Sequence, residues 1–131
     1  MIHIKVKYKS NSNELIKKVW DDSITSLNHA AASVRMIAMR SIRKRKGASP
    51  RGAPPHTHTG LLKKSIVYNV DKKTNTAIVG PSKRIIGPAG MIHEFGGLQR
   101  GNIYPARPFM GPAFDKIKPR LPEFWASSVN R

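Results

Sequence analysis

The chain has 131 residues, 39% of them hydrophobic, and its 24 Lys and Arg against seven Asp and Glu give a formal net charge of +17. This length fits one domain with a single core, and the absence of cysteine excludes disulfides, thiolate catalysis and cysteine-ligated metals. No stretch approaches the ~20 apolar residues that span a bilayer, and the first residues lack the apolar run of a signal peptide. We therefore expect a soluble protein of cytoplasmic type with no membrane partner.

The excess of positive charge repels itself, so an anionic partner would offset it. Nucleic acid is one candidate, because phosphate neutralisation needs no sequence motif. An acidic neighbouring subunit is a second candidate, and a surface that is simply basic is a third. The residues of the candidate basic patch are Lys5, Lys7, Lys9, Arg40, Arg43, Lys44, Arg45 and Lys46.

Residues 1–10 predict a strand. Apolar and polar side chains alternate along it with a period of two, which indicates a half-buried strand with a cationic outer face. The apolar positions are Ile2, Ile4, Val6 and Tyr8.

Residues 13–46 predict one long helix, since the segment contains neither proline nor glycine. Glu14 suits the positive end of the helix dipole, the Arg and Lys cluster up to Lys46 suits the negative end, and Gly47 is a natural stop. Apolar residues recur at steps of three or four and form one stripe, which the rest of the chain must cover. The stripe consists of Ile16, Trp20, Ile24, Leu27, Ala31, Val34, Ala38 and Ile42.

Residues 61–131 predict a small sheet and a C-terminal helix. They follow a loop at 47–60, whose three prolines and three glycines argue against regular structure. Strands at 65–70 and 77–80, joined by the polar turn 71–76, make a hairpin. From Pro112 onward a last helix is expected, kinked or split by Pro119 and Pro122.

The segment between the hairpin and this last helix carries weaker signals. Residues 82–90 predict another loop, and 91–97 are too short for more than one helical turn before two glycines. Residues 98–102 are polar and expected to be exposed. Residues 103–110 should be extended, because the residue before a proline avoids the helical region.

No catalytic motif is present: the chain lacks a Walker loop, GxGxxG, HExxH and GxSxG. The seven acidic residues are scattered, and His56 and His58 would need a third ligand from elsewhere to hold a metal. We therefore expect no enzymatic activity, no cofactor and no metal.

Two signatures, spread over three segments, carry a family resemblance. Residues 50–66, with Pro50, Gly52-Ala-Pro-Pro55-His56 and Thr59-Gly60-Leu-Leu-Lys-Lys-Ser65-Ile66, resemble one signature of phage tail-component proteins. Residues 92–97, Ile-His-Glu-Phe-Gly-Gly, followed by 105–113, Pro-Ala-Arg-Pro-Phe-Met-Gly-Pro-Ala, resemble their second signature. The family is the tail-completion type named for gene product ten of the lambdoid phage HK-ninety-seven. The second signature is also similar to the virion-morphogenesis proteins of contractile-tailed phages.

The resemblance covers roughly residues 13–128 and implies a neck or tail-completion protein. Such proteins form a ring at the head-proximal end of the tail, contact neighbouring neck and tail proteins, and help to join the tail to the DNA-filled head. It implies an α+β fold with the long helix on a small antiparallel or mixed sheet. It also implies a location in the virion, after assembly in the host cytoplasm, and non-specific contact with packaged DNA is compatible with it. The alternative is a nucleic-acid-binding protein without catalysis.

The second signature supplies the candidate assembly residues. Two glycines permit a sharp reversal, and two prolines hold the segment around Arg107 extended. We hypothesise that Glu94 pairs with Arg107, and that the loop at 47–60 is mobile in the free subunit and ordered on assembly. A simpler reading makes Phe95 and Phe109 core residues. The candidates are Glu94, Phe95, Gly96, Gly97, Arg107, Pro108 and Phe109.

Overall fold

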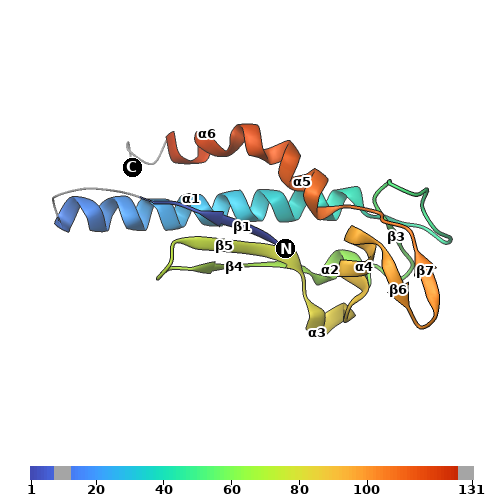
Figure 1. Cartoon of the computed structure of the whole chain (residues 1–131). Coiled ribbons are helices and arrows are strands. Elements are labelled where there is room, and N and C mark those ends of the chain that lie inside the picture. Colours follow the sequence, from blue (N-terminus) through green and yellow to red (C-terminus); the bar gives the residue numbers. More distant parts are fainter. Residues whose placement is uncertain (8–12, 127–131) are drawn as a thin grey trace.

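A single long helix, α1, runs through the middle of the fold (Figure 1). The structure, a computed structural model, describes residues 1–7 and 13–126. The elements in chain order are β1 (Ile2–Lys5), α1 (Asn13–Ser41), β2 (Arg43–Lys44), β3 (His56–Thr57), α2 (Leu61–Ser65), β4 (Ile66–Asp71), β5 (Thr76–Pro81), α3 (Lys83–Ile86), α4 (Ala89–Phe95), β6 (Gly97–Gln99), β7 (Asn102–Tyr104), α5 (Met110–Ile117), the 3-10 turn η1 (Lys118–Arg120) and α6 (Leu121–Ala126).

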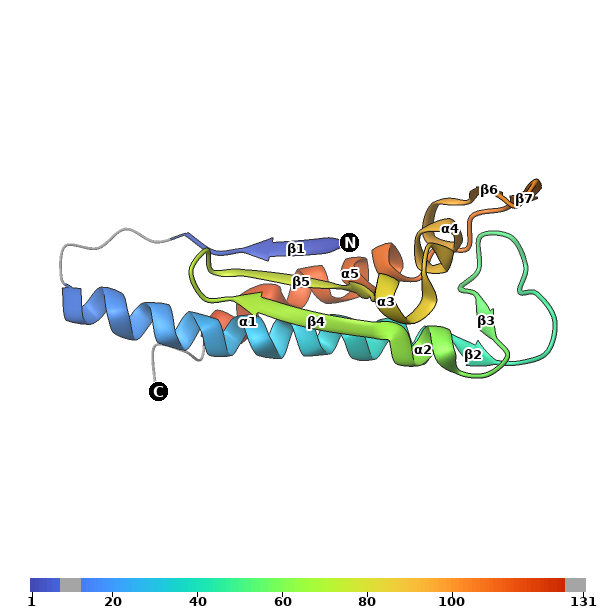
Figure 2. The same cartoon turned by 90° about the horizontal axis from the view of Figure 1, so that it is seen from below.

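The largest sheet has three antiparallel strands in the order β1-β5-β4. Ala77 of β5 lies between Ile4 of β1 and Val70 of β4, so these three side chains share one face. That face packs on α1, which contacts both β4 and β5 (Figure 2). The predicted α+β fold, with a long helix on a small antiparallel sheet and a short C-terminal helix, is confirmed.

The core forms where α1 meets the sheet and the C-terminal helices. Helices α5 and α6 run back along α1, so its stripe is covered by the sheet and by a helical layer (Figure 1). Ala30, Ala31 and Ala38 of α1 are fully buried, and their small size allows these elements to approach closely. The buried positions of the predicted stripe are Ile24, Leu27, Ala31, Val34, Ala38 and Ile42, with Ala30 beside them.

Polar contacts fix the C-terminal helices on α1. The indole Nε1 of Trp125 donates to Ser23 Oγ at 3.0 Å, and Ser26 Oγ donates to the Phe124 carbonyl oxygen at 2.7 Å. Asn75, in the tight turn between β4 and β5, donates from Nδ2 to the Val6 carbonyl oxygen. The buried hydroxyls of Ser23 and Ser26 are tolerated because they are hydrogen-bonded.

The end of α1 differs from the prediction. The helix stops at Ser41 rather than at residue 46, and Ile42 turns into the core with its N–H bonded to Met39 O. The next residues are extended, because β2 pairs in parallel with β3. The prediction that residues 47–60 hold no regular structure is therefore also wrong at β3. The Arg and Lys cluster suits the negative end of a helix dipole, but this does not keep the segment helical when β3 offers its backbone hydrogen-bond partners in a strand.

Residues 82–104 are more ordered than predicted. The loop expected at 82–90 contains α3, and α4 is a seven-residue helix rather than a single turn. The segment expected to be merely polar and exposed forms a second hairpin, β6–β7. The close approach of α4 to β5 explains the missed helix: a Cβ on Gly90 would lie 2.4 Å from Pro81 Cγ, so only glycine permits this packing.

Other sequence predictions agree with the structure or fall partly outside it. The first hairpin forms as β4–β5, and the last helix is split into α5, η1 and α6 around its prolines. The predicted alternation holds in β1, where Ile4 is buried and Lys5 exposed. The strand ends at Lys5, however, so the prediction of a strand over residues 1–10 is wrong at Val6 and Lys7. Tyr8 and Lys9 lie outside the described residues.

Replacing Leu27 by alanine should lower the free energy of unfolding by about 2–5 kcal/mol, because it removes a fully buried side chain and leaves a cavity. Urea denaturation measures this loss. Leu15 lies on the same helix but is 53% exposed, so Leu15→Ala is the matched control and should cost less than about 1 kcal/mol. Equal losses in the two variants would contradict the assigned core.

Candidate interaction site at the glycine turn

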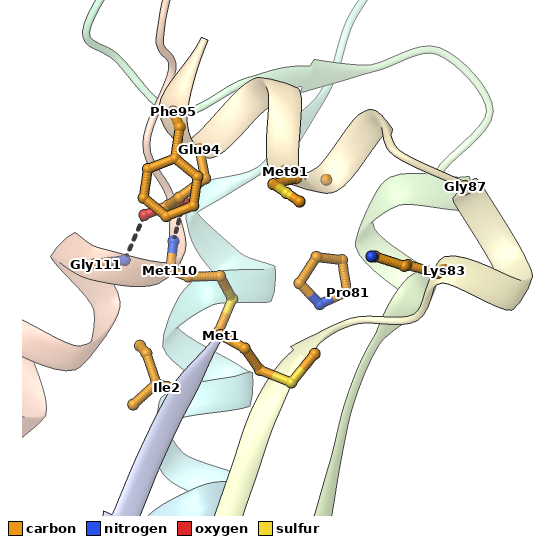
Figure 3. Close-up of a pocket in the computed structure, with 11 residues that line it drawn as sticks. Met1, Ile2, Pro81, Lys83, Gly87, Met91, Glu94, Phe95, Met110 and Gly111 are labelled. Carbon is orange, nitrogen blue, oxygen red and sulfur yellow. Dashed lines mark hydrogen bonds between the residues drawn. The ribbon is translucent and has the colours of Figure 1, made fainter. Parts of the chain in front are cut away.

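The carboxylate of Glu94 holds the start of helix α5. Its two oxygens accept hydrogen bonds from the backbone N–H groups of Phe109, Met110 and Gly111, at 2.9, 2.9 and 2.8 Å. Figure 3 shows the bonds from Met110 and Gly111. The first N–H groups of a helix have no partner within the helix, and its positive end favours an anion. Glu94 therefore caps α5 from a different helix, α4.

The predicted pairing of Glu94 with Arg107 is wrong. Arg107 instead donates from Nε to the Ser49 carbonyl oxygen at 2.9 Å, and its backbone N–H donates to the His93 carbonyl oxygen at 2.6 Å. Both carboxylate oxygens of Glu94 are engaged by the α5 amides. The α4 helix and the proline segment are thus joined as expected, but by backbone contacts and the helix cap rather than by an ion pair.

The turn after α4 requires glycine. Gly96 has φ +72°, and a Cβ there would lie 2.9 Å from Ala106 N and 3.0 Å from Tyr104 O. Its N–H donates to Ile92 O at 2.7 Å and closes the helix. The chain can then reverse while strand β7 and the proline segment pass directly beside it.

The β6–β7 hairpin projects from the body of the molecule (Figure 2). Its two-residue turn, Arg100 and Gly101, has positive φ at both positions, as a type I′ turn requires. Leu98 and Ile103 face each other across the hairpin and are 69% and 85% exposed. Two large apolar side chains are therefore displayed together on a projecting ribbon.

An apolar groove of about 410 Å³ lies beside α4, the helix that precedes this hairpin. Phe95, which is 70% exposed, stands at its edge together with Met91 (Figure 3). Flexible thioether side chains in the wall can adapt their shape to a partner. The apolar lining consists of Met1, Ile2, Pro81, Met91, Phe95 and Met110, and Lys83 and Glu94 are the charged lining residues.

The structure brings the predicted assembly residues together but gives them different roles. Phe109 is fully buried and belongs to the core, as the simpler reading held, whereas Phe95 is exposed. Gly97 begins β6, and Pro108 is half-buried beside the capped helix. Sequence reasoning missed Leu98 and Ile103 as candidate interaction residues, although both are exposed and apolar. Gly101, in the turn between them, was the sequence feature that could have indicated their hairpin.

The loop at 47–60 is anchored to the same site. Gly52 N–H donates to Ala106 O at 3.0 Å, and Ser49 O accepts from Arg107. Its mobility in the free subunit and its ordering on assembly stay predictions.

The predicted basic patch separates into two groups. Lys5 and Lys7 are exposed at and just after β1, which lies beside the middle of α1, whereas β2 lies beyond the C-terminal end of that helix (Figures 1 and 2). Arg40 and residues 43–46 are exposed at this second location. Lys9 lies outside the described residues.

His93 contributes a titratable group to the site. Burial lowers its pKa below the ordinary value of 6.5, and the positive charge of Arg107 lowers it further. Near neutral pH the imidazole is therefore uncharged.

The site as a whole offers apolar surface and backbone hydrogen bonds, which suit contact with a protein.

Replacing Glu94 by alanine should lower the free energy of unfolding by about 2–3 kcal/mol, because three amides at the start of α5 lose a charged acceptor. Urea denaturation checks this value. Glu123, which is exposed and pairs with Arg120, provides the control, and Glu123→Ala should cost less than about 1 kcal/mol. The cap would be dispensable if both variants unfolded at the same urea concentration.

Acidification should destabilise the fold through His93. Because its pKa is lower in the folded protein, the unfolded chain binds the proton first as the pH falls below 6.5. The free energy of unfolding then falls with pH until the lowered pKa is passed. His93→Gln should flatten this part of the stability profile, measured by urea denaturation on both sides of pH 6.5. An unchanged slope in the variant would rule out His93 as the source.

Comparisons with known proteins found no matching family model, curated protein or solved structure. Of the helices that the structure describes, none combines the length and apolar character needed to cross a membrane. Among the same residues, no three His, Cys, Asp or Glu side chains gather closely enough to hold a metal ion. The contacts around Glu94 and the surfaces beside it are therefore the basis on which a function is inferred.

Proposed function

We propose that this chain is a structural assembly protein of a tailed phage or prophage, acting at the head-proximal end of the tail in tail completion and head–tail joining. The signatures at 50–66, 92–97 and 105–113 resemble those of tail-completion proteins. The observation that carries the proposal is the exposed pair Leu98–Ile103. It lies on a hairpin between the two parts of the second signature.

An exposed apolar pair of this kind favours a protein partner. Burial of apolar surface is worth roughly 25 cal/mol per Å², and contiguous exposed apolar side chains are typical of interaction sites. The pair lies on a projecting ribbon, while the apolar groove beside Phe95 is a hollow. A projection and a hollow on one chain suit head-to-tail contacts between copies, and such contacts close into a ring when the rotation permits.

The ring would work through protein–protein contacts. Copies of the chain form it, and neighbouring neck and tail proteins dock on its free surfaces. We propose no catalysis, cofactor or metal, and we place the assembled protein in the virion, after its synthesis in the host cytoplasm. The glycine turn and the Glu94 cap fix the orientation of the hairpin. Binding of a partner would then cost little conformational entropy in ordering the hairpin.

A second candidate function, nucleic-acid binding without catalysis, is favoured by the exposed cations that follow α1. The two functions are compatible, because DNA passes through the joint between head and tail. If the protein is part of the virion, as proposed, these cations would contact packaged DNA without sequence preference.

A stop codon in this gene should produce full heads beside unattached tails in lysates viewed by electron microscopy. Supplying the wild-type protein in trans should restore joined, infectious particles. The double variant Leu98→Ser/Ile103→Ser should not, because it removes the exposed apolar contact without touching the core.

The matched control is Leu15→Ser/Met36→Ser, which replaces two exposed apolar residues on α1 and should complement fully. Joined, infectious particles from the stop-codon lysate would remove the assembly role. Full complementation by the hairpin variant would remove the hairpin from the interface.

A further inference from the structure

A second pocket, of about 380 Å³, opens where α1 ends. We define the basic pocket by its cationic and titratable lining residues, Arg40, Arg43, Arg45, His56 and Lys116. Four of these carry permanent positive charge at neutral pH. The remaining wall consists of short polar, alanine and proline residues from α1 and the loop at 47–60.

The early end of α1 creates this pocket. In extended backbone, side chains two residues apart point to the same side, whereas on a helix they diverge. Arg43 and Arg45 therefore line the pocket together, and Lys44 and Lys46 do not. The extended segment is held by pairing of Arg43 with His56 and by the hydrogen bond from Arg45 N–H to Thr57 O at 3.2 Å.

The cations of the basic pocket have no carboxylate partner among residues 1–7 and 13–126. The ion pair in that part of the chain joins Arg120 and Glu123, and Arg107 is engaged by a backbone carbonyl oxygen. The sequence contains no acidic residue between Asp22 and Asp71, and Asp115 does not line the pocket. Like charges gathered without neutralisation favour an external polyanion.

We propose that the basic pocket binds phosphate groups of a nucleic-acid backbone. Guanidinium groups present paired donors that match phosphate oxygens, and Arg40, Arg43 and Arg45 supply three of them. Exposed Lys44 and Lys46 continue the positive charge beyond the rim, as a run of phosphates requires. An acidic protein is the less favoured partner, because the pocket displays no large apolar side chain to anchor one.

The binding should not read sequence. No Phe, Trp or Tyr lines the pocket or lies between residues 40 and 66, so bases find no large aromatic side chain on which to stack. Contacts are then confined to phosphates, which are the same at every position of a duplex. The assignment stands on charge and geometry, and only its use on packaged DNA rests on the proposed function.

The test is duplex binding by the purified full chain, measured by fluorescence anisotropy across a salt titration. Each lost phosphate contact lowers the slope of log K against log salt by about 0.9. Arg43→Gln/Arg45→Gln should therefore make the slope shallower by about 2, equally for duplexes of different sequence. Arg43→Lys/Arg45→Lys, which keeps the charge, should retain most of the slope and shows that the pocket still forms.

The matched control is Lys17→Gln/Lys18→Gln, which removes the same charge from exposed positions near the start of α1 and should leave the slope unchanged. Equal changes in the two neutralised doubles, or none in either, would overturn the site. Absence of duplex binding by the wild type at low salt, or displacement of the duplex by polyglutamate as effectively per charge as by polyphosphate, would overturn the nucleic-acid assignment. Because no virion is involved, these outcomes are separable from a failed complementation.

Discussion

Burial of the apolar stripe on α1 is the constraint on which the rest of the fold depends. The helix is too long to be covered by one small element, so the three-stranded sheet and the α5–α6 layer cover it together (Figure 1). The alanines and Val34 at its centre allow both to approach closely. The hydroxyls of Ser23 and Ser26 then bond to the C-terminal helix, and they favour one placement of that helix over others.

A chain of specific contacts connects this core to both candidate surfaces. Glu94 caps α5, whose first residues enter the core, and it thereby fixes α4 and the hairpin that follows it. Arg107 binds the His93 carbonyl oxygen on one side and the Ser49 carbonyl oxygen on the other. These hydrogen bonds therefore connect the apolar hairpin to the wall of the basic pocket, although the two surfaces have different chemistry.

The β6–β7 hairpin lies toward the C-terminal end of α1, and so do β2 and β3, whose residues Arg43 and His56 line the basic pocket (Figure 2). In the proposed ring, one end of each subunit would then carry both the subunit contacts and the charge that meets phosphate. Repulsion between the basic pockets of neighbouring copies would oppose assembly until a polyanion offsets it. Such an arrangement would couple ring stability to the presence of nucleic acid. The polyanion would neutralise the repulsion between basic pockets, which the apolar contacts would otherwise have to overcome.

The sequence alone determined the long helix, the alternating first strand, the β4–β5 hairpin and the proline-split C-terminal helix, because these follow from local periodicity and from the fixed φ of proline. It also singled out the segments around the glycine turn and Arg107. Only the tertiary structure decided where α1 ends, which partner Glu94 takes, and that Leu98 and Ile103 share an exposed ribbon. Those outcomes depend on partners distant in the sequence. The Thr57 carbonyl oxygen accepts the Arg45 N–H and holds that segment extended, and the α5 amides bind the Glu94 carboxylate. Local patterns carry no information about such partners, so the basic pocket could not be predicted from the basic cluster that forms it.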